Sequence, residues 1–174
     1  MNRLIFFVGI LIFIVVQNDA HAQYSKDGYL FDQKINAPRV RRPVAHELML
    51  DPMERFLVVS YSSHPTVVVL YEIPSWETKA TYNIPEWFDL SNSFVGPTGR
   101  FLFLDFARYS SKYRRVDLET HAIDTVECYD TPRGCVPKEG GVQQKEIFTK
   151  DELYYISINK KNKRDLLIFK KQGK

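Results

Sequence analysis

The sequence predicts an all-β protein of three similar four-stranded antiparallel units. Short apolar runs bounded by turn residues recur along residues 45–170, one turn-and-strand motif repeats, and helical periodicity is nowhere sustained. The 12 Phe and 10 Tyr residues strengthen this prediction, because aromatic side chains favour strands. We expect a single domain over residues 23–174, with units at about 45–85, 86–135 and 144–170.

The first 22 residues have the pattern of a secretory signal peptide. Arg3 precedes an unbroken apolar run over residues 4–16, and Ala20-His21-Ala22 has the small-x-small form that signal peptidase cuts. The run is shorter than the roughly 20 residues that a spanning helix needs. An uncleaved N-terminal anchor is the alternative. Cleavage would leave no transmembrane segment and would place the protein in the periplasm or outside the cell.

The strands follow in order from apolar, β-branched or aromatic runs. In the first unit we expect strands at 47–50, 56–61, 67–73 and 80–84, and in the second at 93–95, 101–106, 113–118 and 123–129. The third unit supplies 145–148, 153–158 and 165–169 before the chain ends, so residues 29–35 are the candidate for its fourth strand. Runs such as 56–59 are apolar at every position, which indicates sheets covered on both faces.

A repeated turn precedes the second strand of each unit. Asp51-Pro52 aligns with Gly96-Pro97, and Arg55-Phe56-Leu57 aligns with Arg100-Phe101-Leu102, at an offset of 45 residues. For the third copy we align Leu153 with Phe101, an offset of 52.

These residues resemble blades of the WD-repeat and YVTN type of β-propeller. The resemblance rests on the segments Asp51-Pro52-Met53-Glu54-Arg55-Phe56-Leu57-Val58 and Gly96-Pro97-Thr98-Gly99-Arg100-Phe101-Leu102-Phe103, and it covers roughly residues 45–169; the Trp-Asp dipeptide is absent. Propellers usually hold four to eight blades. The resemblance therefore implies that an N-terminal strand completes the last blade. The three-blade arc then either pairs with a second copy to give six blades or collapses into a sandwich. We expect either a homo-oligomer or a dedicated partner, because large apolar faces rarely stay bare.

Both cysteines, Cys128 and Cys135, lie in the exported part around a turn, which favours a disulfide between them. Closing this loop would stabilise the fold by about 2.5 kcal/mol in the chain-entropy model. Two free thiols and half of a metal site are the alternatives. The net charge of +3 and the signal peptide argue against nucleic acid as a partner.

The sequence holds no catalytic, cofactor-binding or metal-binding signature. His46, His64 and His121 lack the spacing of zinc ligands, and no nucleophile elbow, phosphate-binding loop or calcium loop is present. Mixed Arg and Tyr side chains are typical of contact surfaces. The candidate partner-binding residues are Arg108, Tyr109, Tyr113, Arg114, Arg115 and Trp76. The alternative for the Arg/Tyr cluster is an ordinary solvated hairpin, and residues 160–164 are interpreted as a charged hairpin turn.

The predicted function is that of an exported, non-catalytic binding protein of the cell envelope, with a protein as its partner. One alternative is a periplasmic inhibitor or immunity-type protein that neutralises a toxin or hydrolase. A second is a carbohydrate-active enzyme, for which Asp89, Asp105 and Asp117 are the carboxylates to inspect.

Overall fold

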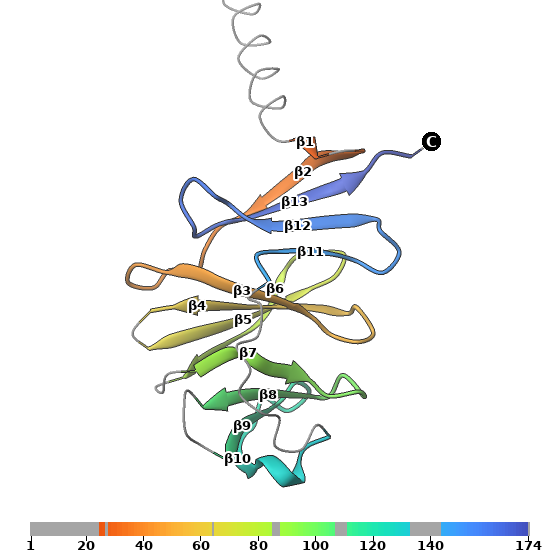
Figure 1. The fold of residues 1–174 in the computed structure, drawn as a ribbon. Helices are drawn as coiled ribbons and strands as arrows, with labels where there is room; N and C mark the ends of the chain where they lie inside the picture. The colour runs from red at the N-terminus through yellow and green to blue at the C-terminus, as the bar shows by residue number, and fades with distance from the viewer. Residues whose placement is uncertain are drawn as a thin grey trace, which may run out of the picture.

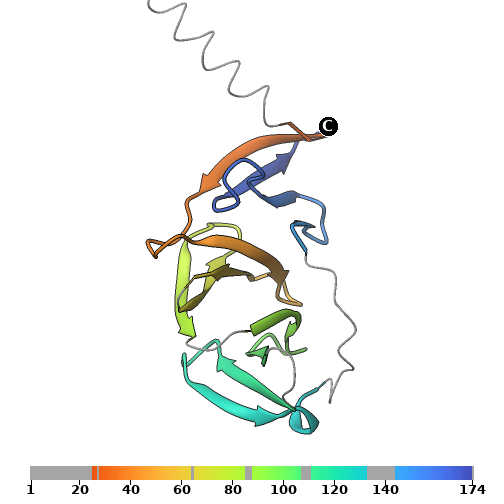
Figure 2. The ribbon, with the colours of Figure 1, turned by 60° about the vertical axis from the view of Figure 1, so that its left-hand side comes forward.

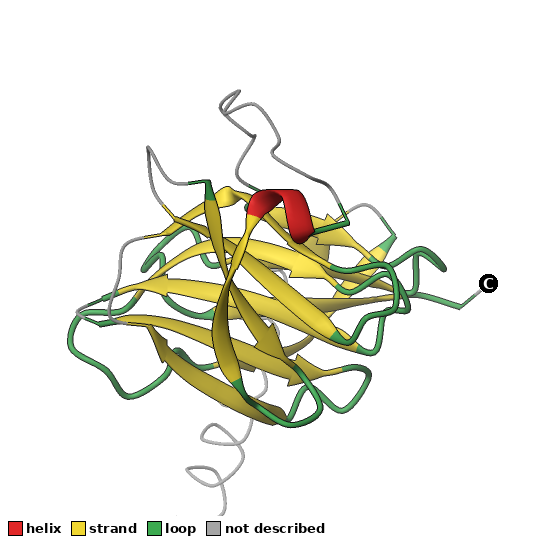
Figure 3. Cartoon of the chain, turned by 90° about the horizontal axis from the view of Figure 1, so that it is seen from below, coloured by secondary structure: helices red, strands yellow, loops and turns green. Residues whose placement is uncertain are grey.

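Three antiparallel sheets lie one above another in the computed structural model, which describes residues 25–26, 28–63, 65–84, 88–106, 111–132 and 144–173 (Figure 1). Within these ranges the chain consists of strands, connecting loops and one short 3-10 helix (Figure 3). The predicted all-β class and the three four-stranded units are confirmed.

The first unit has the strand order β3-β4-β5-β6. Its strands are β3 (Val44–Leu50), β4 (Phe56–Ser62), β5 (Thr66–Glu72) and β6 (Thr78–Ile84). Five consecutive residues in each of the two central strands are buried, so both faces of this sheet are covered. This is the arrangement that the uninterrupted apolar runs predicted.

The second unit has the order β10-β9-β8-β7. Its strands are β7 (Phe88–Val95), β8 (Phe101–Phe106), β9 (Lys112–Asp117) and β10 (Ile123–Glu127). The last strand is shorter than predicted, because residues Cys128–Asp130 form the 3-10 helix η1.

The third unit joins the two ends of the chain. Its strands are β11 (Glu146–Phe148), β12 (Tyr154–Ile158), β13 (Leu166–Lys171) and β2 (Tyr29–Ile35), with β1 (Ser25–Lys26) added at the edge. Strand β2 pairs antiparallel with β13, from Ile35 opposite Leu166 to Tyr29 opposite Lys171. The N-terminal strand therefore fills the fourth place of this sheet.

The same turn joins the first and second strands of all three units. The residue that begins the turn donates its backbone N–H to the carbonyl five positions later, and the residue three positions after it has a left-handed backbone. The hydrogen bonds are Asp51 N to Phe56 O (3.0 Å), Gly96 N to Phe101 O (2.8 Å) and Thr149 N to Tyr154 O (3.1 Å). The left-handed residues are Glu54 (φ 55°), Gly99 (φ 71°) and Glu152 (φ 56°).

These turns correct the predicted alignment of the third unit. Thr149 is equivalent to Gly96, so the offset is 149 − 96 = 53, and Tyr154 rather than Leu153 stands in the place of Phe101. The alignment by sequence was wrong because strands buried on both faces do not alternate, and therefore carry little information about register. A shift of one residue moves every side chain to the opposite face.

The first unit is the middle layer of the stack. Its face with Leu57 and Val59 packs on Ile156 and Ile168 of the third unit, in one apolar core. Its other face, with Val58 and Val68, packs on the second unit in a separate core. Strand β3 contacts both β7 and β11, so the first strands of neighbouring units lie together. The sheets follow one another along an arc (Figure 2).

Candidate functional site: a basic surface formed by two loops

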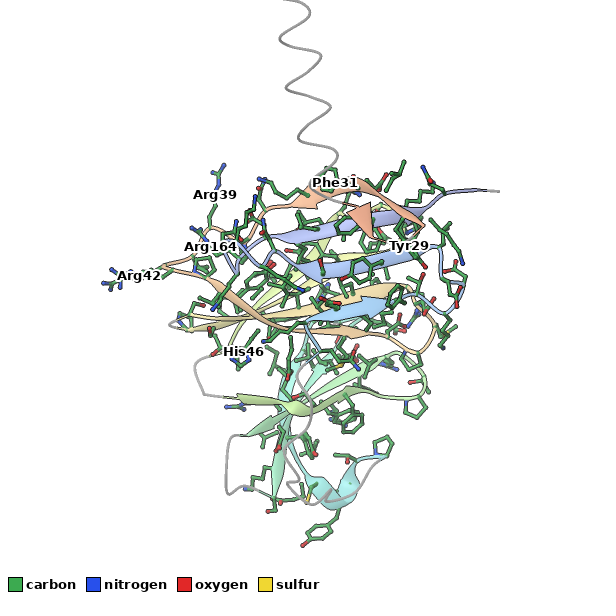
Figure 4. All side chains as sticks on the ribbon, turned by 45° about the horizontal axis from the view of Figure 1, so that its top comes forward. Tyr29, Phe31, Arg39, Arg42, His46 and Arg164 are labelled. Atoms are coloured by element: carbon green, nitrogen blue, oxygen red, sulfur yellow. The ribbon has the colours of Figure 1, made fainter. Side chains whose placement is uncertain are left out.

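Seven exposed cationic side chains come from two loops that are far apart in the sequence. We call them the basic surface; they are Arg39, Arg41 and Arg42 between β2 and β3, and Lys160, Lys161, Lys163 and Arg164 between β12 and β13. Figure 4 shows Arg39, Arg42 and Arg164 on one side of the molecule, with His46 below them.

The two loops are joined by main-chain and side-chain contacts. The Ala45 N–H donates to the carbonyl of Lys163 at 2.8 Å, and the Ala37 N–H donates to Asp165 Oδ1 at 3.1 Å. Lys34 Nζ lies 3.7 Å from Asp165 Oδ2. These contacts follow from the pairing of β2 with β13, which carries the first loop to the side of the second.

The β12–β13 loop is shaped by asparagine side chains that bind its own backbone. Asn159 Oδ1 accepts from the Lys161 N–H at 3.0 Å, and Asn162 Oδ1 accepts from the Arg164 and Asp165 N–H groups at 2.9 and 3.2 Å. Such local bonds are typical of Asn in turns. Because the asparagines satisfy the backbone, the lysine and arginine side chains of this loop are left at the surface.

The β2–β3 loop is constrained by prolines and by an unusual backbone conformation. The Val40 N–H donates to the Pro38 carbonyl at 2.8 Å, and Pro43 is buried. Arg42 has a φ of 50° and Lys163, on the neighbouring loop, has a φ of 54°. A left-handed backbone is uncommon outside glycine, and the surrounding structure must hold it in place.

The surface carries a strong excess of positive charge. Glu146 forms an ion pair with it, 3.1 Å from Lys160. Asp165, between the two loops, pairs with Lys34 of β2. Burial lowers the pKa of Lys145 beside it, and the charge of Lys163 lowers this pKa further, while Glu47 raises it. The field of the loop therefore reaches Lys145. Such a surface attracts anionic groups, and arginines bind carboxylates with two parallel hydrogen bonds.

The residues that the sequence suggested for partner binding do not form one surface. Arg114 and Arg115 lie on β9. Arg114 binds Thr125 and Arg115 binds Asp124, both on the neighbouring strand β10, so the two arginines lie on opposite faces of the sheet. Tyr113 is buried in the second unit. Arg108 and Tyr109 lie outside the described residues.

Trp76 lies in another unit and is 5% exposed. Its ring packs edge-on against Tyr154, with the ring centroids 5.2 Å apart. It is therefore a core residue between the first and third units, and the described surface does not present it to a partner. Cys128 is buried beside the aromatic side chains of the second unit, while Cys135 lies outside the described residues, so the disulfide stays a prediction.

The carboxylates named for catalysis have structural surroundings. Arg100 donates to Asp117 Oδ2 at 2.9 Å, and the Glu119 and Thr120 N–H groups donate to Asp117 Oδ1. These bonds, with Arg100 first, lower the pKa of Asp117 to about 2. Asp105 is buried in register with Asp89, whose side chain lies outside the described residues.

Sequence reasoning missed the basic surface because its two loops lie near opposite ends of the sequence. Residues 160–164 were interpreted only as a charged hairpin turn. Two features of the sequence could have revealed it: the two runs of cationic residues, and the prediction that residues 29–35 complete the third unit. A strand order that places β2 beside β13 also places the two runs together.

No protein-family model matches this sequence, and the search of curated proteins finds no match. The resemblance to WD-repeat and YVTN blades therefore stays an expectation from the sequence. Among the residues that the structure describes, no three His, Cys, Asp or Glu side chains come together in a way that could hold a metal ion. The described part of the chain also has no helix long and apolar enough to cross a membrane.

Proposed function

We propose that this chain is an exported, non-catalytic binding protein of the cell envelope and that its basic surface binds an acidic protein partner. The observation that carries the proposal is the convergence of seven cations from two loops, each held by its own hydrogen bonds. Binding residues are often found on loops that a rigid scaffold positions. A preformed cationic surface on a stack of sheets fits that pattern.

A protein partner is favoured over a lipid surface by what accompanies the cations. Membrane-binding surfaces usually add large apolar side chains that enter the lipid. Here the neighbouring apolar side chains are small: Val40 is half-buried and Val44 is 38% exposed. Four of the seven cations are arginines, whose planar groups match carboxylates better than lysine does. Aspartate- and glutamate-rich segments are the chemistry that this surface would recognise.

The test is fluorescence anisotropy with a labelled peptide of alternating Glu and Gly. We expect binding that weakens steeply with added salt, because exposed charges are screened. The variant R39E/R42E/R164E should lose binding. The matched control K79E/K112E/K170E reverses three exposed lysines on other surfaces and should bind nearly as the wild type does.

Two results would contradict the proposal. One is equal binding by the two triple variants, which would show that net charge rather than this surface is responsible. The other is binding to anionic vesicles or to a sulfated polysaccharide with none to the acidic peptide. Export is tested separately: the secreted protein should begin at Gln23, and reduction should add two protons to its intact mass through Cys128 and Cys135.

A further inference from the structure

The two loops of the basic surface meet at one carboxylate, that of Asp165, whose side chain is 15% exposed. We propose that Asp165 is the positioning residue of this surface: it fixes the β2–β3 loop against the β12–β13 loop and so holds the cations of both loops in one arrangement. The inference rests on the proposed function, because it explains how the surface that binds the acidic partner is kept in place.

The side chain of Asp165 contacts both loops and the strand before the first of them. Its Oδ1 accepts from the Ala37 N–H of the β2–β3 loop at 3.1 Å, across 128 positions of the sequence. Its Oδ2 accepts from the Asn162 side-chain amide of the β12–β13 loop at 2.9 Å. The same oxygen lies 3.7 Å from Nζ of Lys34, which is on β2. One carboxylate therefore ties together three segments that carry or flank the cations.

Asp165 is itself held by the sheet beneath it. Its carbonyl accepts from the Asn159 N–H at 2.8 Å, and its N–H donates to Asn162 Oδ1 at 3.2 Å. It directly precedes β13, whose residues Leu166 and Ile168 are fully buried in the core between the third and first units. The position of the carboxylate is therefore set by the fold, and the carboxylate in turn sets the position of the loops.

Charge alone gives the opposite expectation for this residue. A carboxylate beside seven cations weakens the positive potential that attracts an acidic partner. Removing its charge would by itself strengthen binding, by roughly twofold for a charge about 8 Å from the ligand in water. A surface with loose loops binds more weakly, because only a fraction of the molecules has the binding arrangement and the ligand must order the rest. The two effects of Asp165 on affinity therefore differ in sign.

Glu146 offers a matched comparison. It lies on β11, outside both loops, and its carboxylate pairs with Lys160 of the basic surface at 3.1 Å. Glu146→Gln removes one negative charge beside the surface and leaves the bond between Ala37 and Asp165 in place. Asp165→Ala removes one negative charge and that bond. Asp165→Asn removes the same charge but keeps an oxygen that can accept from the Ala37 N–H.

The test measures the affinity of the three variants for the labelled peptide of alternating Glu and Gly by fluorescence anisotropy. We expect Asp165→Ala to bind about three- to tenfold more weakly than the wild type. Asp165→Asn should bind at least about threefold more tightly than Asp165→Ala. Glu146→Gln should bind as the wild type does or up to about twofold more tightly.

Two affinity results would overturn the positioning role. One is binding by Asp165→Ala that equals or exceeds that of the wild type, which would show that charge outweighs any ordering of the loops. The other is equal binding by Asp165→Ala and Asp165→Asn, because the bond to Ala37 would then contribute nothing.

Hydrogen exchange of the free protein separates this inference from the proposed function. Asp165→Ala should speed exchange at the Ala37 amide and also at the Ala45 amide, whose bond to the Lys163 carbonyl joins the same loops. Asp165→Asn should leave both amides slow. The Asp51 amide, bonded in a turn of the first unit, should exchange at the wild-type rate in every variant, which shows that the fold is intact.

The exchange results decide the positioning role whether or not the peptide binds. Faster exchange at Ala45 in Asp165→Ala, with no peptide binding by the wild type, would refute the proposed function and support the positioning role. Unchanged exchange at Ala45 in that variant would refute the positioning role and leave the proposed function standing.

Discussion

Replacing Asp51 tests the turn between β3 and β4 of the first unit. The Asp51 side chain is fully buried; its Oδ1 accepts from the Phe56 N–H at 3.0 Å and its Oδ2 from Arg55 Nε at 3.3 Å. Arg55 in turn donates to the Gly99 carbonyl of the second unit at 3.1 Å. Asp51→Ala removes the acceptor from one amide and from one half-exposed guanidinium.

The expected loss can be worked out from these contacts. A hydrogen bond to a charged group contributes about 1.5–3 kcal/mol, and an ion pair with a half-exposed arginine adds about 0–1 kcal/mol. We therefore expect Asp51→Ala to lower the free energy of unfolding by about 2–3 kcal/mol. For a domain of this size, that corresponds to a melting temperature roughly 5–10 °C lower. Urea unfolding followed by circular dichroism measures the change.

The third unit supplies the matched control. There Thr149 Oγ1 accepts from the Tyr154 N–H at 3.0 Å, which is the bond that Asp51 makes with Phe56. Asp51→Thr should keep this bond and lose no more than about 1 kcal/mol, chiefly from the ion pair with Arg55. The reasoning is refuted if Asp51→Ala unfolds within about 0.5 kcal/mol of the wild type, or if Asp51→Thr is as unstable as Asp51→Ala.

Three further changes test other contacts. The bond from Arg100, and secondarily the bonds from the turn amides, lower the pKa of Asp117 from 3.8 to about 2. This carboxylate therefore stabilises the fold at pH values above its unfolded pKa, and the stabilisation is lost as the pH falls toward 2. Asp117→Asn should flatten the fall in melting temperature over that pH range. Tyr82→Phe removes a 2.7 Å bond between the Tyr82 hydroxyl and His121 Nδ1, which joins the first two units, and should cost about 1 kcal/mol in urea unfolding. Ile156→Ala empties a fully buried site between the third and first units and should cost about 2–5 kcal/mol by the same assay.

Each of these has its own control. An unchanged acid profile in Asp117→Asn would contradict the assigned ion pair with Arg100. Tyr129→Phe, at a residue 77% exposed, should be neutral where Tyr82→Phe is not. Leu153→Ala, at a residue 37% exposed, should cost less than about 0.5 kcal/mol. A greater loss there than in Ile156→Ala would favour the offset of 52 over 53.

Local chemistry made most of the fold predictable. Strand β8 was placed at its exact bounds, and β2 was predicted both as a strand and as the fourth member of the third unit. Apolar runs closed by Pro and Gly turns carry this information within a few residues. The repeat at an offset of 45 was likewise visible, because the Arg-Phe-Leu segments of the first two units are identical.

The candidate site was harder to predict, because its residues depend on contacts between distant segments. Trp76 and Tyr113 were expected at a partner surface, yet packing buries both, since an aromatic ring beside a turn can point inward or outward. The basic surface needs its two loops side by side, as in the bond from the Ala45 N–H to the Lys163 carbonyl, and the pairing of β2 with β13 brings them together.

The sequence by itself determined the all-β class, the number of units and the turns between strands, because these depend on residues close together in the chain. Only the tertiary structure decided the register of the third unit and the faces that its side chains occupy. Its strand β12 is buried at all five positions, so nothing in the local pattern separates one face from the other. The basic surface follows from the pairing of β2 with β13, which brings its two loops together.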